Sequence, residues 1–388
     1  MPRIGTDSLR EALVRGAEPE VWIRWPRQLG DVMFALPFFG TLREEWGRAA
    51  AAEGRELRWV AVGHAIGAAL FSEAAPDFIA ESLIESGGEG KPDPWNLLRR
   101  WRQHRPAAVI NLSQSVRLAL AAWMARVPVR AGIADNGLGL LYQHPFKYRD
   151  LPIHLARRYE PLLESLTARQ DLRWLPVGPA NLGGAAAPGK LRAAGWDGRP
   201  YVTLAFGTRG MNKRWFPERD KWPGLAQLLH EQGFAAVWLG GPDEVPLGAE
   251  LAALSPGSLD LTGQTSIPEA LAIQSEAYGN VAVDTGLAHT AAATGTPTVV
   301  LMGGSMEHLI APVGPQVVTL RGSAVDSREG ESAGFDTWGA VAHRVTPLRV
   351  LNALHALVGA ARGASIAAGI LDAPATTTPA RPAARTRA

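Results

Sequence analysis

Short apolar runs rich in β-branched residues recur along the chain, and they alternate with longer segments in which apolar residues keep a helical spacing. The segments 223–233 and 267–277 show that helical spacing. The apolar runs lie at 21–25, 57–62, 78–84, 107–112, 201–206, 235–240, 281–284, 298–302 and 316–320. Strands that alternate with helices of this length predict βαβ units and parallel sheets, and therefore an α/β protein.

One segment interrupts this alternation. Residues 176–200 are dense in Gly, Pro and Ala and have little periodicity, which is typical of a linker. We therefore expect a Rossmann-like domain over 1–175 and a second over 201–359, which ends in an amphipathic helix over 345–359. Residues 360–388 are rich in Ala, Pro, Thr and Arg, a composition that predicts a disordered tail. Ligands of open α/β sheets bind at the carboxyl ends of the strands, so we expect the site in a cleft between the two sheets.

The composition is that of an ordinary globular protein and excludes several classes. Of 388 residues, 46% are apolar and 20% are charged, and a net charge of +2 gives no general attraction to nucleic acid. The absence of cysteine excludes disulfides, thiolate nucleophiles and cysteine metal sites. The most apolar stretch, 281–302, contains Asp284, His289 and Pro297 and is a poor spanning helix. With no apolar signal-peptide core at the N-terminus, we expect a cytoplasmic protein without a transmembrane segment.

Two loops in the second half follow predicted strands and carry groups that suit a nucleotide. The loop at 206–217 contains glycine, Lys213 and Arg214, which can offer backbone N–H groups and a cation to a phosphate. The loop at 239–244 ends in Glu244, whose carboxylate can accept hydrogen bonds from ribose hydroxyls. The alternatives are an ordinary basic loop and a helix-start acid that the helix dipole favours.

A third loop, within 283–303, joins a strand that ends at Asp284 to a helix through the turn Thr285-Gly286. The free N–H groups of a helix start bind anions, and His289 in the first turn points to the same place. The alternative is a capped helix with a core-facing histidine. Three such loops at strand ends of one domain together favour a nucleotide-binding domain.

Several familiar signatures are absent. The chain has no P-loop, since 87–92 has the wrong spacing, and no G-x-G-x-x-G after a strand, since 136–142 lacks the third glycine. Ser305 fails the nucleophile-elbow pattern because Glu307 replaces its last glycine. No D-x-D pair occurs, so a carboxylate pair for a divalent cation is not indicated.

Five motifs occur in an order that resembles a known family. They are IRWPRQLGDVMFALP (23–37), GTRGMNKRWFP (207–217), GGPDE (240–244), LTGQTSIPEA (261–270) and VDTGLAHTAAATGTPTVVLMG (283–303). The chain resembles the bacterial heptosyltransferases of lipopolysaccharide core synthesis, glycosyltransferase family 9, over roughly residues 20–358. The resemblance implies the GT-B fold, two Rossmann-like domains whose parallel sheets face each other across a cleft.

The resemblance also implies an activity and its residues. The family transfers a heptose, with inversion and without a metal or other cofactor, from an ADP-linked donor to a sugar hydroxyl of a lipid-linked core. By position, Asp31 corresponds to the general base. The implied donor contacts are Lys213 for phosphate, Glu244 for ribose, and Thr208, Thr265, Asp284, Thr285, Gly286 and His289. The segment 303–315 departs from the family pattern near the sugar end of the donor, and an iron-holding branch of the family uses cysteines that this chain lacks.

The position of Asp31, where the first strand gives way to a helix, has two interpretations. A helix start favours the ionised carboxylate, so Asp31 should be charged near neutrality and able to accept the proton of a sugar hydroxyl. The alternative is a helix cap, which contributes about 1 kcal/mol of stability. The whole set of motifs favours the base.

Basic clusters in the first half suggest an acceptor-binding surface. Residues 1–170 contain 22 Lys and Arg against 19 Asp and Glu, a net of +3. Arginine recognises phosphate and carboxylate groups such as those of a lipopolysaccharide inner core, and it also favours an anionic membrane surface. The alternative is a solvated helix face. The candidate acceptor contacts are Arg99, Arg100, Arg102, Arg126 and Arg130.

The sequence therefore predicts a metal-independent inverting GT-B glycosyltransferase that uses a nucleotide-sugar donor and a lipid-linked saccharide acceptor at the cytoplasmic face of the inner membrane. Two alternatives stay open. One is the same fold with another nucleotide sugar, in O-antigen or other surface polysaccharide assembly. The other is a sugar-nucleotide-binding protein without transferase activity.

Overall fold

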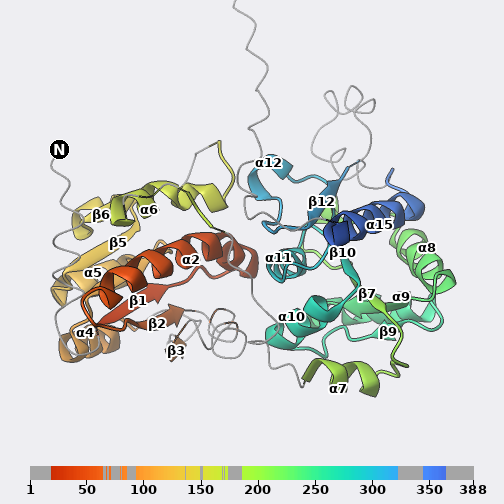
Figure 1. Ribbon diagram of the computed structural model, residues 1–388, viewed down its shortest axis with the longest axis horizontal. Coiled ribbons are helices and arrows are strands. Elements are labelled where there is room, and N and C mark those ends of the chain that lie inside the picture. Colours follow the sequence, from red (N-terminus) through yellow and green to blue (C-terminus); the bar gives the residue numbers. More distant parts are fainter. Residues whose placement is uncertain are drawn as a thin grey trace, which may run out of the picture.

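The chain forms two lobes, each built on a six-stranded sheet in which all neighbouring strands are parallel (Figure 1). The computed structural model describes residues 19–63, 67, 70, 79, 81–84, 93–135, 137–148, 152–167, 169, 171–173, 186–321 and 344–363. Among these residues, no helix has the length and apolar character needed to cross a membrane.

The first lobe has the strand order β3-β2-β1-β4-β5-β6. Its strands are β1 (Glu20–Arg24), β2 (Arg58–Gly63), β3 (Glu81–Ile84), β4 (Ala108–Asn111), β5 (Val129–Ile133) and β6 (His144–Phe146). Its helices are α2 (Leu29–Ala51), α4 (Pro94–His104), α5 (Val116–Met124), η2 (Leu138–Leu141), η3 (Ala156–Tyr159) and α6 (Glu160–Thr167).

The second lobe has the strand order β12-β11-β10-β7-β8-β9. Its strands are β7 (Tyr201–Ala205), β8 (Ala235–Leu239), β9 (Leu259–Asp260), β10 (Gly279–Val283), β11 (Thr298–Leu301) and β12 (Val317–Leu320). Its helices are α7 (Ala186–Ala193), η5 (Met211–Lys213), α8 (Glu218–Glu231), η6 (Pro242–Glu244), α9 (Val245–Ala253), α10 (Ile267–Glu276), α11 (Gly286–Ala293), α12 (Glu307–Ile310) and α15 (Pro347–Gly363).

The alternation along each strand explains the layers. In β1, Val21 and Ile23 pack with α2 and α6, while Trp22 packs on the opposite face with α4 and α5. In β10, Val281 and Val283 pack with α8 and α15, while Ala282 packs with α11. Both faces of each sheet are therefore apolar, as parallel sheets covered by helices require.

All nine predicted strands are present, and the α/β prediction is confirmed. The strands that the sequence missed are β5, β6 and β9. The last two have only three and two residues, too short for a periodic pattern. The sequence VRAGI of β5 is interrupted by arginine and glycine.

The segment boundaries differ in detail from those expected. The expected linker, 176–200, contains α7, and its residues 176–185 lie outside the described residues. Helix α15 continues four residues past 359, to Gly363, and the rest of the expected tail also lies outside the described residues. The domain limits themselves stay a prediction.

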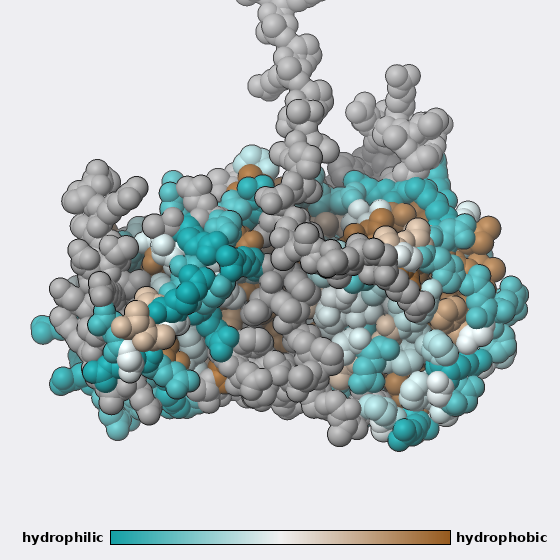
Figure 2. Space-filling model, in the orientation of Figure 1, coloured by the Kyte–Doolittle hydropathy of each residue, from teal (hydrophilic) through white to brown (hydrophobic). Residues whose placement is uncertain are grey.

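The second half of helix α2 has a charged outward side, whereas residues 32–39 in its first half are all buried. Arg48 forms ion pairs with Glu44 at 2.6 Å and with Glu45 at 2.9 Å, and hydrophilic side chains cover the outward side of α2 in Figure 2. On the inward side, Phe38 and Phe39 are fully buried. The start of α2 points toward the second lobe, where it packs against α11 (Figure 1).

The lobes also meet through a second contact, between the segment before η3 and the end of α12. The Leu155 N–H donates a hydrogen bond to the Leu309 carbonyl at 2.8 Å. One ring nitrogen of His154, Nε2, lies 2.8 Å from the Ala311 carbonyl oxygen. A continuous cluster of buried apolar side chains contains residues of both lobes, such as Phe38 and Leu271.

We predict that Gly132→Ala lowers the free energy of unfolding by about 1–3 kcal/mol, the usual cost of overpacking. A Cβ on Gly132 would lie 2.6 Å from Cζ of Tyr142, whose buried hydroxyl accepts a hydrogen bond from Asn111 at 2.7 Å. The matched control is Gly47→Ala in α2, where a Cβ meets nothing within 4 Å. It should raise the same free energy by about 0.5–1 kcal/mol. Urea unfolding followed by circular dichroism measures both, and a Gly132→Ala variant as stable as the wild type would contradict this packing.

Candidate active site

Two helix starts, one from each lobe, pack directly against each other. Asp31 lies in the first turn of α2 after β1, and His289 lies in the first turn of α11 after β10. A Cβ on Gly30 would lie 3.3 Å from Cδ2 of His289, and a Cβ on Gly286 would lie 3.3 Å from Cδ2 of Leu29. The structure therefore brings the carboxyl ends of the two sheets, and the candidates that follow them, to one place.

Neither helix start is capped by the side chain at its N-cap. These residues are Gln28 before α2 and Thr285 before α11, and neither side chain makes a capping hydrogen bond. Uncapped N–H groups and the helix dipole favour an anion at this point. Asp31 is the third residue of its helix and not the N-cap, which weakens the alternative that it serves only as a cap.

The carboxylate of Asp31 is partly buried beside two tyrosines. Burial raises the pKa of Asp31 above its usual value. Burial is also the main reason that the pKa of Tyr148 rises to about 12, with a further contribution from the Asp31 charge. Tyr159 lies beside Tyr148, with ring centroids 5.0 Å apart, and Asp31 also raises its pKa. The helix dipole favours the charged form of Asp31, whereas burial opposes it and makes Asp31 a stronger base.

Asp284 is buried and holds together several of the predicted donor-binding groups. Its Oδ2 lies 2.7 Å from Nζ of Lys213 and accepts a hydrogen bond from Ser305. Its backbone carbonyl accepts a hydrogen bond from Thr208 Oγ1 at 3.2 Å. Asp284 is only 4% exposed, whereas Lys213 is 32% exposed. The ion pair therefore compensates a buried charge and keeps the ammonium group of Lys213 at the start of α11.

His289 is a buried and uncharged imidazole. Burial lowers its pKa to about 4, although Asp284, whose Oδ1 lies 4.0 Å from Nε2, partly opposes this shift. The ring packs edge-on against Phe34 with centroids 4.7 Å apart, and no described residue bonds its buried Nδ1. At neutral pH, His289 can therefore donate or accept a hydrogen bond, but it cannot supply a positive charge.

The side chain of Glu244 contacts the loops that follow β7 and β8. Its Oε2 accepts a hydrogen bond from the Gly241 N–H at 2.6 Å, and a Cβ on Gly207 would lie 2.8 Å from Oε1. The carboxylate thus acts as the helix-start acid that the sequence offered as an alternative, and its ribose contact stays a prediction. Thr265 lies between β9 and α10, directly before Ser266, the N-cap of α10.

The five candidate acceptor arginines do not gather around Asp31. Arg100 pairs with Glu81 at 2.9 Å, and Nε of Arg130 donates to the Leu141 carbonyl at 2.9 Å. Arg99 and Arg102 lie in the second half of α4, which leads to the amino end of β4, and Arg126 precedes β5. All five therefore lie toward the amino ends of the strands, whereas Asp31 lies at the carboxyl end, and their acceptor role stays a prediction.

Three further residues line this site that no sequence motif indicated, namely Tyr148, His154 and Ser305. The ring of His154 lies 5.4 Å from that of Phe34, and burial lowers its pKa. In the neutral form its Nε2–H donates to the Ala311 carbonyl, and its Nδ1 accepts from the Ala156 N–H at 3.2 Å. The segment that contains His154 has no periodicity, so only the contact between the lobes shows its importance.

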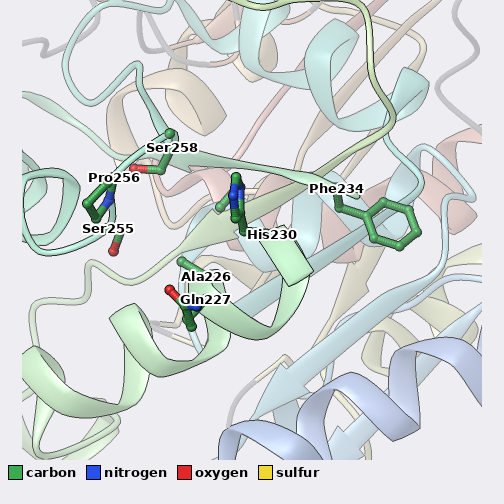
Figure 3. A pocket seen from close by; sticks show the side chains of 9 residues that line it. Ala226, Gln227, His230, Phe234, Ser255, Pro256 and Ser258 are labelled. Carbon is green, nitrogen blue, oxygen red and sulfur yellow. The ribbon is translucent and has the colours of Figure 1, made fainter. Parts of the chain in front are cut away.

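Two other hollows lie away from this site. A cavity of ≈ 10 Å³, about the space of one water molecule, lies between α8 and the loop before β9, near His230 and Ser258 (Figure 3). A larger hollow of ≈ 260 Å³ lies beside Trp196 and Arg199. Both lie at the amino ends of strands and contain none of the predicted site residues. No group of three His, Asp or Glu side chains in the described part of the chain could hold a metal ion.

We predict that His289 makes the protein less stable as the pH falls from about 6.5 to about 4. An unfolded chain binds a proton at the usual histidine pKa of 6.5, whereas the folded protein binds it only near 4. The free energy of unfolding therefore decreases through this window, by up to about 3 kcal/mol from this group. His289→Gln should flatten the decrease in urea unfolding experiments, whereas His230→Gln on the exposed side of α8 should not. An equally steep decrease in His289→Gln would show that other groups cause it.

Comparisons with known proteins agree with this fold. The lipooligosaccharide heptosyltransferase 2 of Haemophilus influenzae is 27% identical over 257 residues, which are 62% of this chain and 73% of that protein. The structure of E. coli ADP-heptose lipopolysaccharide heptosyltransferase II matches with a TM-score of 0.69 at 20% identity, over 88% of this chain and 99% of the other. A family 9 glycosyl transferase of Veillonella parvula matches with a TM-score of 0.72 at 19% identity, over 88% and 97%. The family model for glycosyltransferase family 9 (heptosyltransferase) matches residues 95–332, and the chain belongs to that family.

Proposed function

We propose that this protein transfers a heptose from ADP-heptose to a hydroxyl of a lipopolysaccharide core acceptor, with inversion and with Asp31 as the general base. The observation that supports the proposal is the contact between the two helix starts, in which the start of α2, with Asp31 in its first turn, packs against residues 286–289 of the other lobe. The family and the names of its relatives supply the sugar and the acceptor class.

The reaction is a single displacement. The acceptor oxygen forms a bond to the anomeric carbon of the heptose as the bond from that carbon to the ADP oxygen breaks. Asp31 takes the proton of the acceptor hydroxyl, and ADP leaves with the electron pair of the broken bond. The raised pKa of Asp31 supports this role, because a more basic carboxylate accepts a proton more readily.

Two groups stabilise the charge that develops on the departing diphosphate. The start of α11 offers uncapped N–H groups, and Lys213 offers its ammonium group from the pair with Asp284. A diphosphate bound here competes with Asp284 for Lys213, so Asp284 holds the lysine in place before the donor arrives. In this proposal, Lys213 and the start of α11 stabilise the charge of the departing diphosphate, and the reaction uses no metal ion.

The remaining predicted donor contacts surround this centre. Thr208 is fixed to the Asp284 carbonyl, and Thr285 and Gly286 form the helix start itself. Glu244 keeps Oε1 above Gly207, where it can accept a hydrogen bond from a ribose hydroxyl. Thr265 completes the donor side from the loop before α10. The acceptor enters from the first lobe, and the protein acts in the cytoplasm on a lipid-linked saccharide at the membrane.

We predict that Asp31→Asn lowers kcat by about 10²- to 10⁴-fold, the contribution of a positioned general base, and leaves ADP affinity within about twofold. The matched control is Glu44→Gln on the outward side of the same helix, where the side chain pairs with Arg48. The assay for both variants is transfer from ADP-heptose to a core acceptor, with the released ADP as the measured product. Full activity in Asp31→Asn would disprove the role of Asp31 as the base.

We predict that ADP binds more tightly than UDP or GDP and that Lys213→Ala weakens ADP binding by about 10- to 100-fold, the effect of losing one charge-assisted hydrogen bond. Arg219→Ala is the matched control, because it also breaks an ion pair of the second lobe, with Glu250 on the exposed side of α8. Calorimetric titration measures the three nucleotides. A preference for UDP or GDP would favour another nucleotide sugar, and no binding of any of them would refute the donor site.

A further inference from the structure

Helix α5 exposes an apolar stripe on the surface of the first lobe. Val116, Leu120 and Trp123 are spaced by four and three residues, so they lie on one side of the helix, and their exposures are 50%, 43% and 51%. Trp95 on α4 and Leu140 on η2 are 65% and 94% exposed, and both elements pack against α5. We call these five side chains, with the arginines around them, the α4–α5 surface.

The opposite side of α5 is already packed in the core. Leu118, Ala119, Ala121 and Ala122 are buried at 2% exposure or less. Among the nine residues of α5, VRLALAAWM, only Arg117 is charged or polar. A helix on the surface of a soluble protein ordinarily turns a polar side outward, so an apolar outward side needs something to cover it.

The charged side chains within α4 and α5 are all positive. The sequence contains no Asp or Glu between Asp93 and Asp135. The exposed arginines there are Arg99, Arg102, Arg105, Arg117 and Arg126. None of their side chains forms an ion pair or a hydrogen bond with any residue that the structure describes. On α2, by contrast, Arg48 is paired with two glutamates.

We propose that the α4–α5 surface docks on the surface of an anionic lipid bilayer. Tryptophan favours the level of the lipid headgroups, aliphatic side chains enter the acyl boundary, and arginines bind the headgroup phosphates. The inference goes beyond the proposed function, on which it rests only for the expectation that the acceptor is lipid-linked.

The charge of the surface favours lipid over a second copy of this chain. A symmetric dimer buries the same patch on both subunits, so it would bring the five arginines of one copy close to those of the other. No carboxylate of α4 or α5 is available to compensate them. A bilayer with anionic headgroups covers the apolar stripe and neutralises the arginines together.

The position of α5 connects this surface to the candidate active site. Helix α5 begins five residues after β4 ends at Asn111, and Arg24 at the end of the neighbouring strand β1 donates a hydrogen bond to Ser113 in that loop. Asp31 follows β1 at the same edge of the sheet. A saccharide anchored in a bilayer under α5 would therefore extend along the start of this helix toward Asp31.

The test is co-sedimentation of the full chain with vesicles of phosphatidylethanolamine and phosphatidylglycerol, and with vesicles of phosphatidylcholine alone. We expect binding to the anionic vesicles that weakens as salt is raised. Trp95→Ala combined with Trp123→Ala should reduce the bound fraction about 10-fold, and Arg99→Gln combined with Arg102→Gln and Arg117→Gln should reduce it similarly. The matched control, Leu348→Ala with Arg349→Gln on the exposed side of α15, should change it less than twofold.

Several results would overturn the proposal. These are no binding to anionic vesicles, equal binding to both lipids, unchanged binding by the α4–α5 variants, and a wild-type dimer in sedimentation equilibrium that these variants dissociate. The replaced side chains are exposed, so we expect the variants to keep the melting temperature of the wild type. An unchanged melting temperature shows that a variant is folded. Asp31→Asn should bind vesicles like the wild type, and the assay contains neither donor nor acceptor. If the proposed transfer reaction were disproved, the result of the vesicle-binding assay would still stand. If the vesicle-binding assay failed, the proposed transfer reaction would likewise be unaffected.

Discussion

The site depends on the close approach of two helix starts from different lobes. Gly30 and Gly286 permit it, because a Cβ at either position would lie 3.3 Å from a side chain of the other helix. Such a distance is tighter than ordinary van der Waals contact, so the side chain of His289 or Leu29 would have to move by a few tenths of an ångström. The contact brings the helix start that carries Asp31 against the helix start that carries His289, so the proposed reaction would use groups from both lobes, although each lobe contains its own sheet.

The second constraint is the buried charge of Asp284. An unpaired carboxylate at 4% exposure would be very costly, and Lys213, Ser305 and the nearby His289 reduce this cost. Two glycines allow this arrangement: a Cβ on Gly303 would lie 3.1 Å from Cα of Lys213, and Gly304 donates its N–H to the Asn212 carbonyl at 2.9 Å. The loop after β11 thus holds the loop after β7, and the lysine is positioned before any ligand binds.

The sequence predicted the two parallel sheets because each long strand is apolar on both faces, as in YVTLA and AAVWL. It predicted Asp31, Lys213, Asp284 and His289 because each lies in a motif directly after a strand, and the structure brings all four to one place. It could not predict that burial raises the pKa of Asp31, or that His154 closes the junction through Ala311. It also placed the acceptor site on arginines that lie at the amino ends of the strands. Charge clusters are visible along a sequence, but the end of the sheet at which they lie depends on helix packing.

Burial at the junction shifts the pKa of a carboxylate and the pKa of an imidazole in opposite directions, and both shifts suit the proposed glycosyl transfer. It raises the pKa of Asp31, which strengthens the carboxylate as a base. It lowers the pKa of His289 to about 4 and that of His154 as well, so that both imidazoles are neutral at pH 7. Neither imidazole therefore brings a positive charge to the contact between the two helix starts, and burial is the cause of the raised pKa of Asp31. In the proposed reaction, the positive charge that stabilises the departing diphosphate would then come from Lys213 and the start of α11.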